Sequence, residues 1–218
     1  MIGRILVAVA LLLGATHTAR ATAVTTFGYG LQPCGAYLDD REQQNIDELA
    51  FIEWLGGYLS GVNATSTHTN NIMGDPNLKG AVYKLGAYCR AHPSLTVAVA
   101  LYGFVKGWSS TTAEQADEAM VYGNGYKSCR TYLDSRMQQS PDQRGFIDWL
   151  GGYLSGVNAM SLNTNSALGD SELTNAVTWL DDYCRVNPGA RFASAIGARV
   201  RPKSPQSLAL AGEDKGAK

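Results

Sequence analysis

The chain has 218 residues, and its 18 basic and 19 acidic side chains give a net charge of −1 at neutral pH. Without the leader described next, which holds two arginines and no acids, the net charge becomes 16 − 19 = −3. Nucleic-acid binding needs clustered Lys and Arg. The sequence shows no such cluster, so nucleic acid is excluded as the expected partner.

Residues 1–21 have the layout of a secretory signal peptide. Arg4 precedes an apolar run at residues 5–13, and a small-residue triplet ends at Ala21. The run is well short of the ~20 apolar residues that span a bilayer, and no later segment has a long uncharged apolar run. We expect cleavage after Ala21, no membrane insertion of the mature chain, and a periplasmic or secreted location.

Four cysteines are present, at Cys34, Cys89, Cys129 and Cys184. In an oxidising compartment an even number indicates two disulfides, although four cysteines allow three connectivities. The sequence has no CxxC motif and no Cys/His metal spacing, so it predicts neither a metal site nor a cofactor.

The chain contains two tandem copies of one sequence unit. An offset of 95 aligns Cys34 with Cys129 and Trp54 with Trp149, and roughly 34 of 60 positions are identical without a gap. This predicts a helical module at 28–107, a linker at 108–121, a second module at 122–201, and a disordered tail at 202–218. Since the offset pairs each copy's own cysteines, the simplest disulfides are Cys34–Cys89 and Cys129–Cys184. Pairing between the copies stays open.

The periodicity predicts an all-α fold with about four helices in each copy. A first helix starts at the bridging cysteine, and a third opens at the N-caps Asp75 and Asp170. A fourth follows Pro93 and Pro188. The second helix carries apolar residues on one face at helical spacing: Phe51, Trp54, Leu55, Tyr58, Leu59 and Val62.

Glycines recur inside this second helix, one turn apart, at Gly57 and Gly61 and again at Gly152 and Gly156. Each costs roughly 1 kcal/mol relative to alanine, so another backbone must lie close. One interpretation is a tight helix crossing inside the module. The other is an exposed groove that receives a partner's helix or extended peptide. The candidate binding residues are Trp54, Gly57, Tyr58, Gly61, Asn63, Trp149, Gly152, Tyr153, Gly156 and Asn158.

The sequence predicts no catalytic residue. His68 and His92 align with asparagines, so the copies share no histidine, and Ser60 and Ser155 lack a GxSxG context. The shared acids could form a carboxylate pair for hydrolysis, but solvated faces and helix caps are the favoured roles. These acids are Asp39 and Asp134, Asp47 and Asp142, Glu53 and Asp148, and Asp75 and Asp170.

The segments CGAYL and CRTYL, a central amphipathic helix and a closing cysteine resemble the HdeA-like periplasmic proteins. The run FIEWLGGYLSGVN, followed by YCRAHPSLTVAVALYGFV, is also similar to the Tai-type immunity proteins of type VI secretion, which have a related helical fold. The resemblance covers both copies, about 70% of the chain.

The HdeA-like resemblance implies a non-enzymatic chaperone that exposes apolar surface on acidification and shields other periplasmic proteins. Protonation of 19 carboxylates would leave the chain strongly positive and self-repelling. This chain departs from the family, because HdeA is a single module of which two copies associate. Whether the two fused modules pack together as an internal pseudo-dimer stays open. The Tai-like resemblance implies an immunity protein that binds one secreted toxin.

The sequence therefore predicts a non-enzymatic exported protein that binds other proteins. The chaperone role stands first, the immunity role second, and a carboxylate-based hydrolase third. The oligomeric state stays open.

Overall fold

A computed structural model of the chain describes residues 24–66, 70–74, 77–108, 119–161, 166–169 and 172–200. The expected signal peptide, the expected tail at 202–218, most of the expected linker (109–118) and the expected caps Asp75 and Asp170 lie outside these residues. In the described ranges, no helix combines the length and the apolarity that a bilayer crossing needs.

The regular elements of the described residues are all helical, and both expected disulfides, Cys34–Cys89 and Cys129–Cys184, are confirmed. The second half repeats the element order of the first. The first half contains the short 3-10 helix η1 (Gly28–Leu31) and helices α1 (Cys34–Glu42), α2 (Ile46–Thr65), α3 (Lys79–Ala91) and α4 (Val97–Trp108). The second contains η2 (Gly123–Tyr126), α5 (Cys129–Met137), α6 (Pro141–Met160), α7 (Leu173–Val186) and α8 (Phe192–Val200).

Two helices of each copy start later than the sequence indicated. The third starts at Lys79 and at Leu173, with Leu78 and Glu172 as N-caps in place of the expected Asp75 and Asp170. The fourth starts at Val97 and at Phe192, and not at Pro93 and Pro188. The residues between Pro93 and Val97 begin with a turn, and their carbonyls accept the first N–H groups of α1. Cys34 N donates to Leu95 O at 2.7 Å, and Gly35 N donates to Pro93 O at 2.9 Å. The same pair of bonds in the second copy runs from Cys129 and Arg130 to Ala190 and Pro188.

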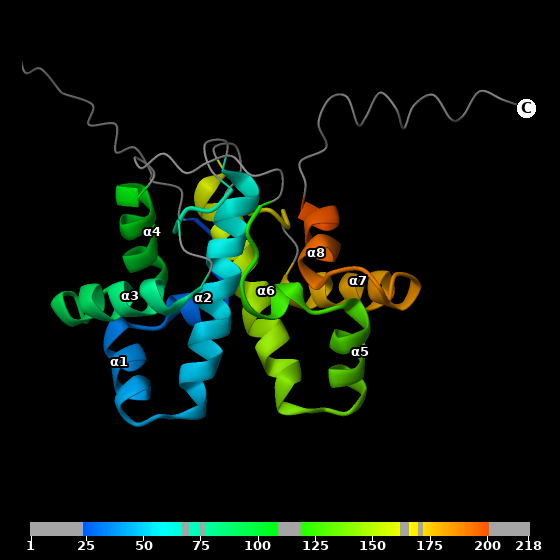
Figure 1. The fold of residues 1–218 in the computed structure, drawn as a ribbon, viewed down its shortest axis with the longest axis horizontal. Coiled ribbons are helices and arrows are strands. Elements are labelled where there is room, and N and C mark those ends of the chain that lie inside the picture. The colour runs from blue at the N-terminus through cyan, green and yellow to red at the C-terminus, as the bar shows by residue number, and fades with distance from the viewer. Residues whose placement is uncertain are drawn as a thin grey trace, which may run out of the picture.

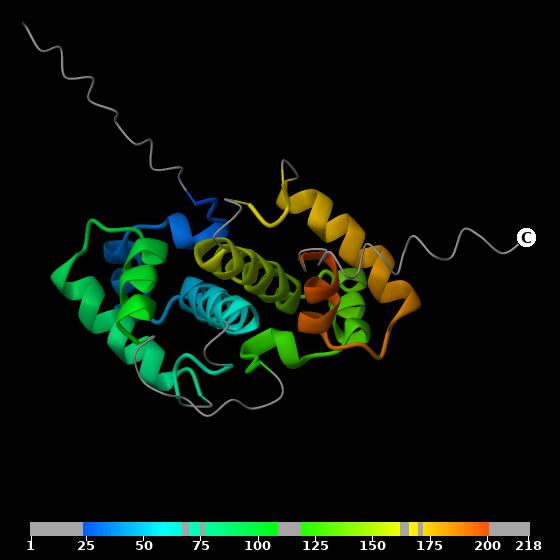
Figure 2. The same cartoon turned by 90° about the horizontal axis from the view of Figure 1, so that it is seen from above.

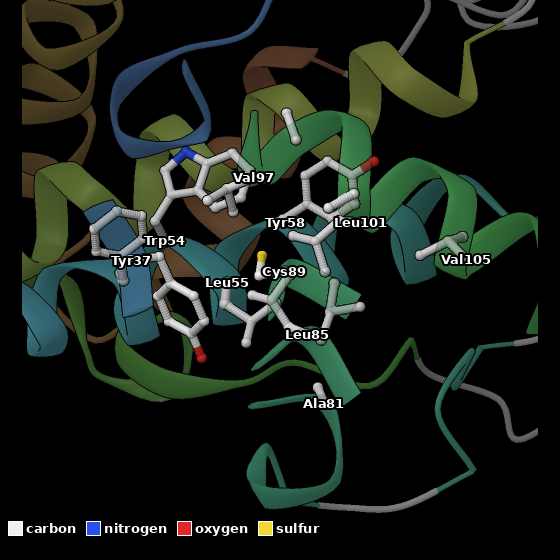
Figure 3. Packing of buried hydrophobic residues seen from close by; sticks show 14 of the residues in the cluster. Tyr37, Trp54, Leu55, Tyr58, Ala81, Leu85, Cys89, Val97, Leu101 and Val105 are labelled. Atoms are coloured by element: carbon white, nitrogen blue, oxygen red, sulfur yellow. The ribbon is translucent and has the colours of Figure 1, made fainter. Parts of the chain in front are cut away.

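Helices α2 and α6 run side by side through the middle of the molecule (Figures 1 and 2). Helices α1, α3 and α4 lie on the outer side of α2, and α5, α7 and α8 lie on the outer side of α6 (Figure 1). All six residues of the predicted apolar face of α2 are buried. Figure 3 shows Trp54, Tyr58 and Leu101 among the packed side chains of the first copy.

The glycines lie where α2 and α6 touch. A methyl group added to Gly57 would overlap Trp149 O and come within 2.8 Å of Tyr153 N. A methyl group on Gly152 would likewise overlap Trp54 O, so the contact is reciprocal. A methyl group on Gly61 would overlap Tyr153 O, four residues beyond the Trp149 O that Gly57 meets, so the two helices run in the same direction. This exchange of equivalent contacts is the pattern of a two-fold symmetric interface.

The two interpretations of the glycines are settled by this geometry. A tight helix crossing exists, but it joins the two copies and does not lie inside one module. The exposed groove is wrong, because the helix of the other copy fills it. Each copy therefore has its own hydrophobic core, and the two copies pack against each other along α2 and α6.

Replacing Gly57 with alanine should destabilise the fold by about 3 kcal/mol or more, since two backbones must separate to admit the methyl group. Gly103→Ala on α4 is the matched control, because its methyl group would lie at an ordinary 3.7 Å from the Tyr88 hydroxyl. Urea unfolding followed by tryptophan fluorescence measures both variants. Equal stability of Gly57→Ala and the wild type would contradict the crossing.

Candidate functional site

The ten candidate binding residues are brought together at one place, the interface between α2 and α6. All ten are buried, with Trp54 and Trp149 at 0% and Asn63 at 2% exposure. Their polar atoms bind two short extended segments of the same chain. We call these the first arm (residues 25–27) and the second arm (residues 120–122).

Each arm precedes one copy but binds the central helix of the other. In the first arm, Phe27 N donates to Ser155 Oγ at 2.9 Å, and Thr25 O accepts from Asn158 Nδ2 at 2.8 Å. Phe27 O accepts from Trp54 Nε1 of its own copy at 2.7 Å. The first arm therefore ties the two central helices together.

The second arm makes the equivalent bonds in the opposite direction. Tyr122 N donates to Ser60 Oγ at 2.9 Å, and Met120 O accepts from Asn63 Nδ2 at 2.9 Å. Tyr122 O accepts from Trp149 Nε1 at 2.7 Å. The end of the expected linker is thus packed structure, and the copies exchange arms reciprocally.

Ser60 and Ser155 hold the arms. The Ser60 hydroxyl donates to Gly56 O at 2.6 Å while it accepts from the arm, and Ser155 does the same with Gly151 O at 2.7 Å. Because both hydrogen-bonding directions of each hydroxyl are used, these serines have a structural role.

Glu53 and its counterpart Asp148 are acids that the sequence placed wrongly on solvated faces. The Asp148 side chain is only 12% exposed and lies 3.9 Å from Arg144. Glu53 Oε2 accepts a hydrogen bond at 3.0 Å from Asn124 N, in η2 of the other copy. Burial raises the pKa of Glu53, the Asn124 bond and the charge of Lys127 oppose this rise, and Asp142 adds to it. The folded state therefore favours the protonated carboxyl.

The remaining candidate acids and histidines do not gather. Asp39, Asp134 and Asp142 are exposed, and His92 stacks on Tyr88 with ring centroids 4.6 Å apart. His68 lies outside the described residues, as does the side chain of Asp47. In the described part of the chain, no three His, Cys, Asp or Glu side chains come close enough to hold a metal ion.

Sequence reasoning missed the arms because their partners lie in the other copy. A signal was present, since the offset of 95 aligns Phe27 with Tyr122, each followed by a glycine at positive φ. Gly28 and Gly123 turn the chain from each arm into the 3-10 helix, a conformation that residues with a Cβ rarely adopt.

Comparisons of the chain with protein-family models, with curated proteins and with solved structures gave no match in any of the three.

Asn63→Ala should destabilise the protein by about 1–3 kcal/mol, because it leaves buried backbone groups without their partner. The lost bonds are those to Met120 O and from Ile72 N. Hydrogen exchange should rise at residues 120–122 more than at residues 25–27, which Asn158 holds. Asn175→Ala, at an exposed position on α7, is the control. Unchanged exchange at residues 120–122 would show that Asn63 does not hold the second arm.

The variant Glu53→Gln tests how the contribution of Glu53 to the stability of the fold changes with pH. A raised pKa means that Glu53 stabilises the fold fully below its unfolded pKa, and this contribution is lost as pH rises through the higher folded pKa. The amide can still accept from Asn124, so the variant should exceed wild-type stability at pH 7 and match it near pH 3. Urea titrations at both values measure this, with exposed Glu172→Gln as the control. If Glu53→Gln were less stable than the wild type at pH 7, the ionised Glu53 would stabilise the fold, which contradicts a raised pKa.

Proposed function

We propose that this chain is a non-enzymatic exported protein that binds other proteins, acting as an acid-stress chaperone of the HdeA-like kind. The observation that carries the proposal is the contact between the copies, in which Tyr122 of the second arm is buried in the core of the first copy and Phe27 of the first arm packs against the core of the second. A chaperone for denaturing proteins needs apolar surface, and separation of the copies would uncover these contacts. The two disulfides fit an exported protein.

The position of the disulfides supports an opening at this interface. Cys34–Cys89 lies within the first copy and Cys129–Cys184 within the second. Separation of α2 from α6 would therefore break no covalent bond. Each half would keep its own disulfide while the face it turns toward the other copy became accessible. An internal pseudo-dimer of this kind replaces the association of two single-module chains that the resemblance implies.

The proposed trigger is net charge. At pH 2.5, below the ordinary carboxyl pKa values of about 4, the 19 acids are neutral, and the 16 Lys and Arg side chains that remain without the leader stay positive. Repulsion between the halves then opposes their packing. Glu53 acts in the other direction, because protonation of this buried carboxyl stabilises the interface.

Glu53 favours the second candidate, an immunity protein that keeps one fold across this pH range and binds a single toxin. Its acid-stabilised contact and the reciprocal arms both hold the halves together. A carboxylate-based hydrolase ranks third, since the Glu53 carboxylate is engaged by Asn124 and the Ser60 and Ser155 hydroxyls hold the arms.

The chaperone proposal predicts that the oxidised protein at pH 2.5 loses its near-ultraviolet circular dichroism, binds an apolar dye several-fold more strongly than at pH 7, and suppresses aggregation of a denaturing client. A variant with Trp108→Phe and Trp179→Phe keeps Trp54 and Trp149, so a red shift of its emission reports opening of the interface. The fully reduced protein, in which both disulfides are broken, is the control for general unfolding.

An unchanged spectrum without client protection would contradict the chaperone proposal. It would leave the immunity role, which pull-down of a single partner at neutral pH tests.

A further inference from the structure

An open depression of about 840 Å³ lies on the outer side of the second copy, lined mainly by α5 and α7. Its volume is within the range of ligand-binding sites. It is far less buried than the interface, and three arginines and two aspartates contribute to its lining: Arg130, Arg136, Arg185, Asp134 and Asp181.

Two of these arginines follow the cysteines of the second disulfide, and both line the depression. Arg130 directly follows Cys129, and Arg185 directly follows Cys184, and the Cα atoms of the bridged cysteines are 4.9 Å apart. Arg185 pairs with Asp182 on its own helix, but both side chains of this pair are more than 60% exposed, so the pair is weak. Both guanidinium groups therefore remain open to an anionic ligand.

The third arginine is held in place by a buried network. Arg136 Nη2 donates to Asp181 Oδ2 at 2.7 Å, and the Tyr132 hydroxyl donates to Asp181 Oδ1 at 2.6 Å. Burial, followed by the bond to Asp181, raises the pKa of Tyr132, so its hydroxyl stays a neutral donor. A guanidinium has five N–H donors, so Arg136 keeps donors for a ligand after this pair is made.

The first copy lacks this arrangement. Where the second copy has Arg130, Met137, Gln143 and Asp181, the first has Gly35, Glu42, Glu48 and Gly86. The equivalent charged lining of the first copy consists of two arginines and three acids, for a net charge of −1. The lining of the second copy, three arginines and two aspartates, has a net charge of +1. The duplication has therefore produced a basic face on one half only.

We propose that this depression binds an acidic peptide segment of a partner protein. Its carboxylates pair with Arg130 and Arg185, which present planar guanidinium groups suited to bidentate carboxylate binding. Its neighbouring apolar side chains pack on Leu133 and on Met137, which is 75% exposed. The inference rests on the proposed function only in taking a protein segment as the ligand.

Fluorescence anisotropy at pH 7 tests this with a fluorescein-labelled peptide of alternating Glu and Leu. The double variant Arg130→Ala/Arg185→Ala should bind this peptide at least ~10-fold more weakly, the loss of two charged contacts. Arg90→Ala, the first-copy equivalent of Arg185→Ala, should bind like the wild type. Gly35→Arg is the converse variant: a Cβ at Gly35 meets Pro93 O at an ordinary 3.6 Å, so the added arginine fits and should create weak binding on the first copy.

Equal binding by the double variant and the wild type would overturn the proposal, as would equal binding of a peptide with Lys in place of Glu. Competition by inorganic phosphate at equal molar concentration would show a simple anion site and overturn the peptide assignment. Unchanged circular dichroism of the double variant shows that it folds. If the wild-type protein does not bind the peptide but opens and protects a client at pH 2.5, this inference alone is contradicted. If it binds the peptide but neither opens nor protects a client at pH 2.5, the chaperone proposal alone is contradicted.

Discussion

The contact between the backbones of α2 and α6 is the constraint on which the rest of the structure depends. Gly57 and Gly152 each lie against a carbonyl of the opposite helix, so no side chain can separate the two. The large aromatic residues next to these glycines pack instead into the core of their own copy. Their indole nitrogens then meet the carbonyls of the two arms, so the position of the arms follows from the crossing.

Features that depend on local periodicity or on the repeat could be predicted from the sequence. The buried face of α2 follows from its 3.6-residue spacing, and the disulfides follow from the offset that pairs each copy's own cysteines. The glycines of α2 and α6 predicted that another stretch of backbone packs closely against each helix. They did not show which stretch, because a pattern of small residues carries no information about the partner. The late start of α4 and the burial of Glu53 depend on groups distant in sequence, which periodicity does not show.

The two copies agree where they meet and differ where they face outward. The interface uses the same serine, asparagine, glycine and tryptophan positions from both halves. On the outside, the first copy exposes apolar side chains at Leu49, Tyr83 and Val99, where the second has Arg144, Thr178 and Ser194. The two copies thus share the chemistry of their symmetric interface and present outer surfaces of different chemistry.

The exchange of arms also sets the order in which the chain can reach its native state. Phe27 bonds to a residue 128 positions further along, whereas Tyr122 bonds back to one 62 positions earlier. During synthesis the second arm can bind its partner helix as soon as it emerges. The first arm must wait for Ser155 and Asn158 of α6, so the contact between the copies stays incomplete until that helix has been made. Because both halves belong to one chain, their association is a late folding step that does not depend on protein concentration.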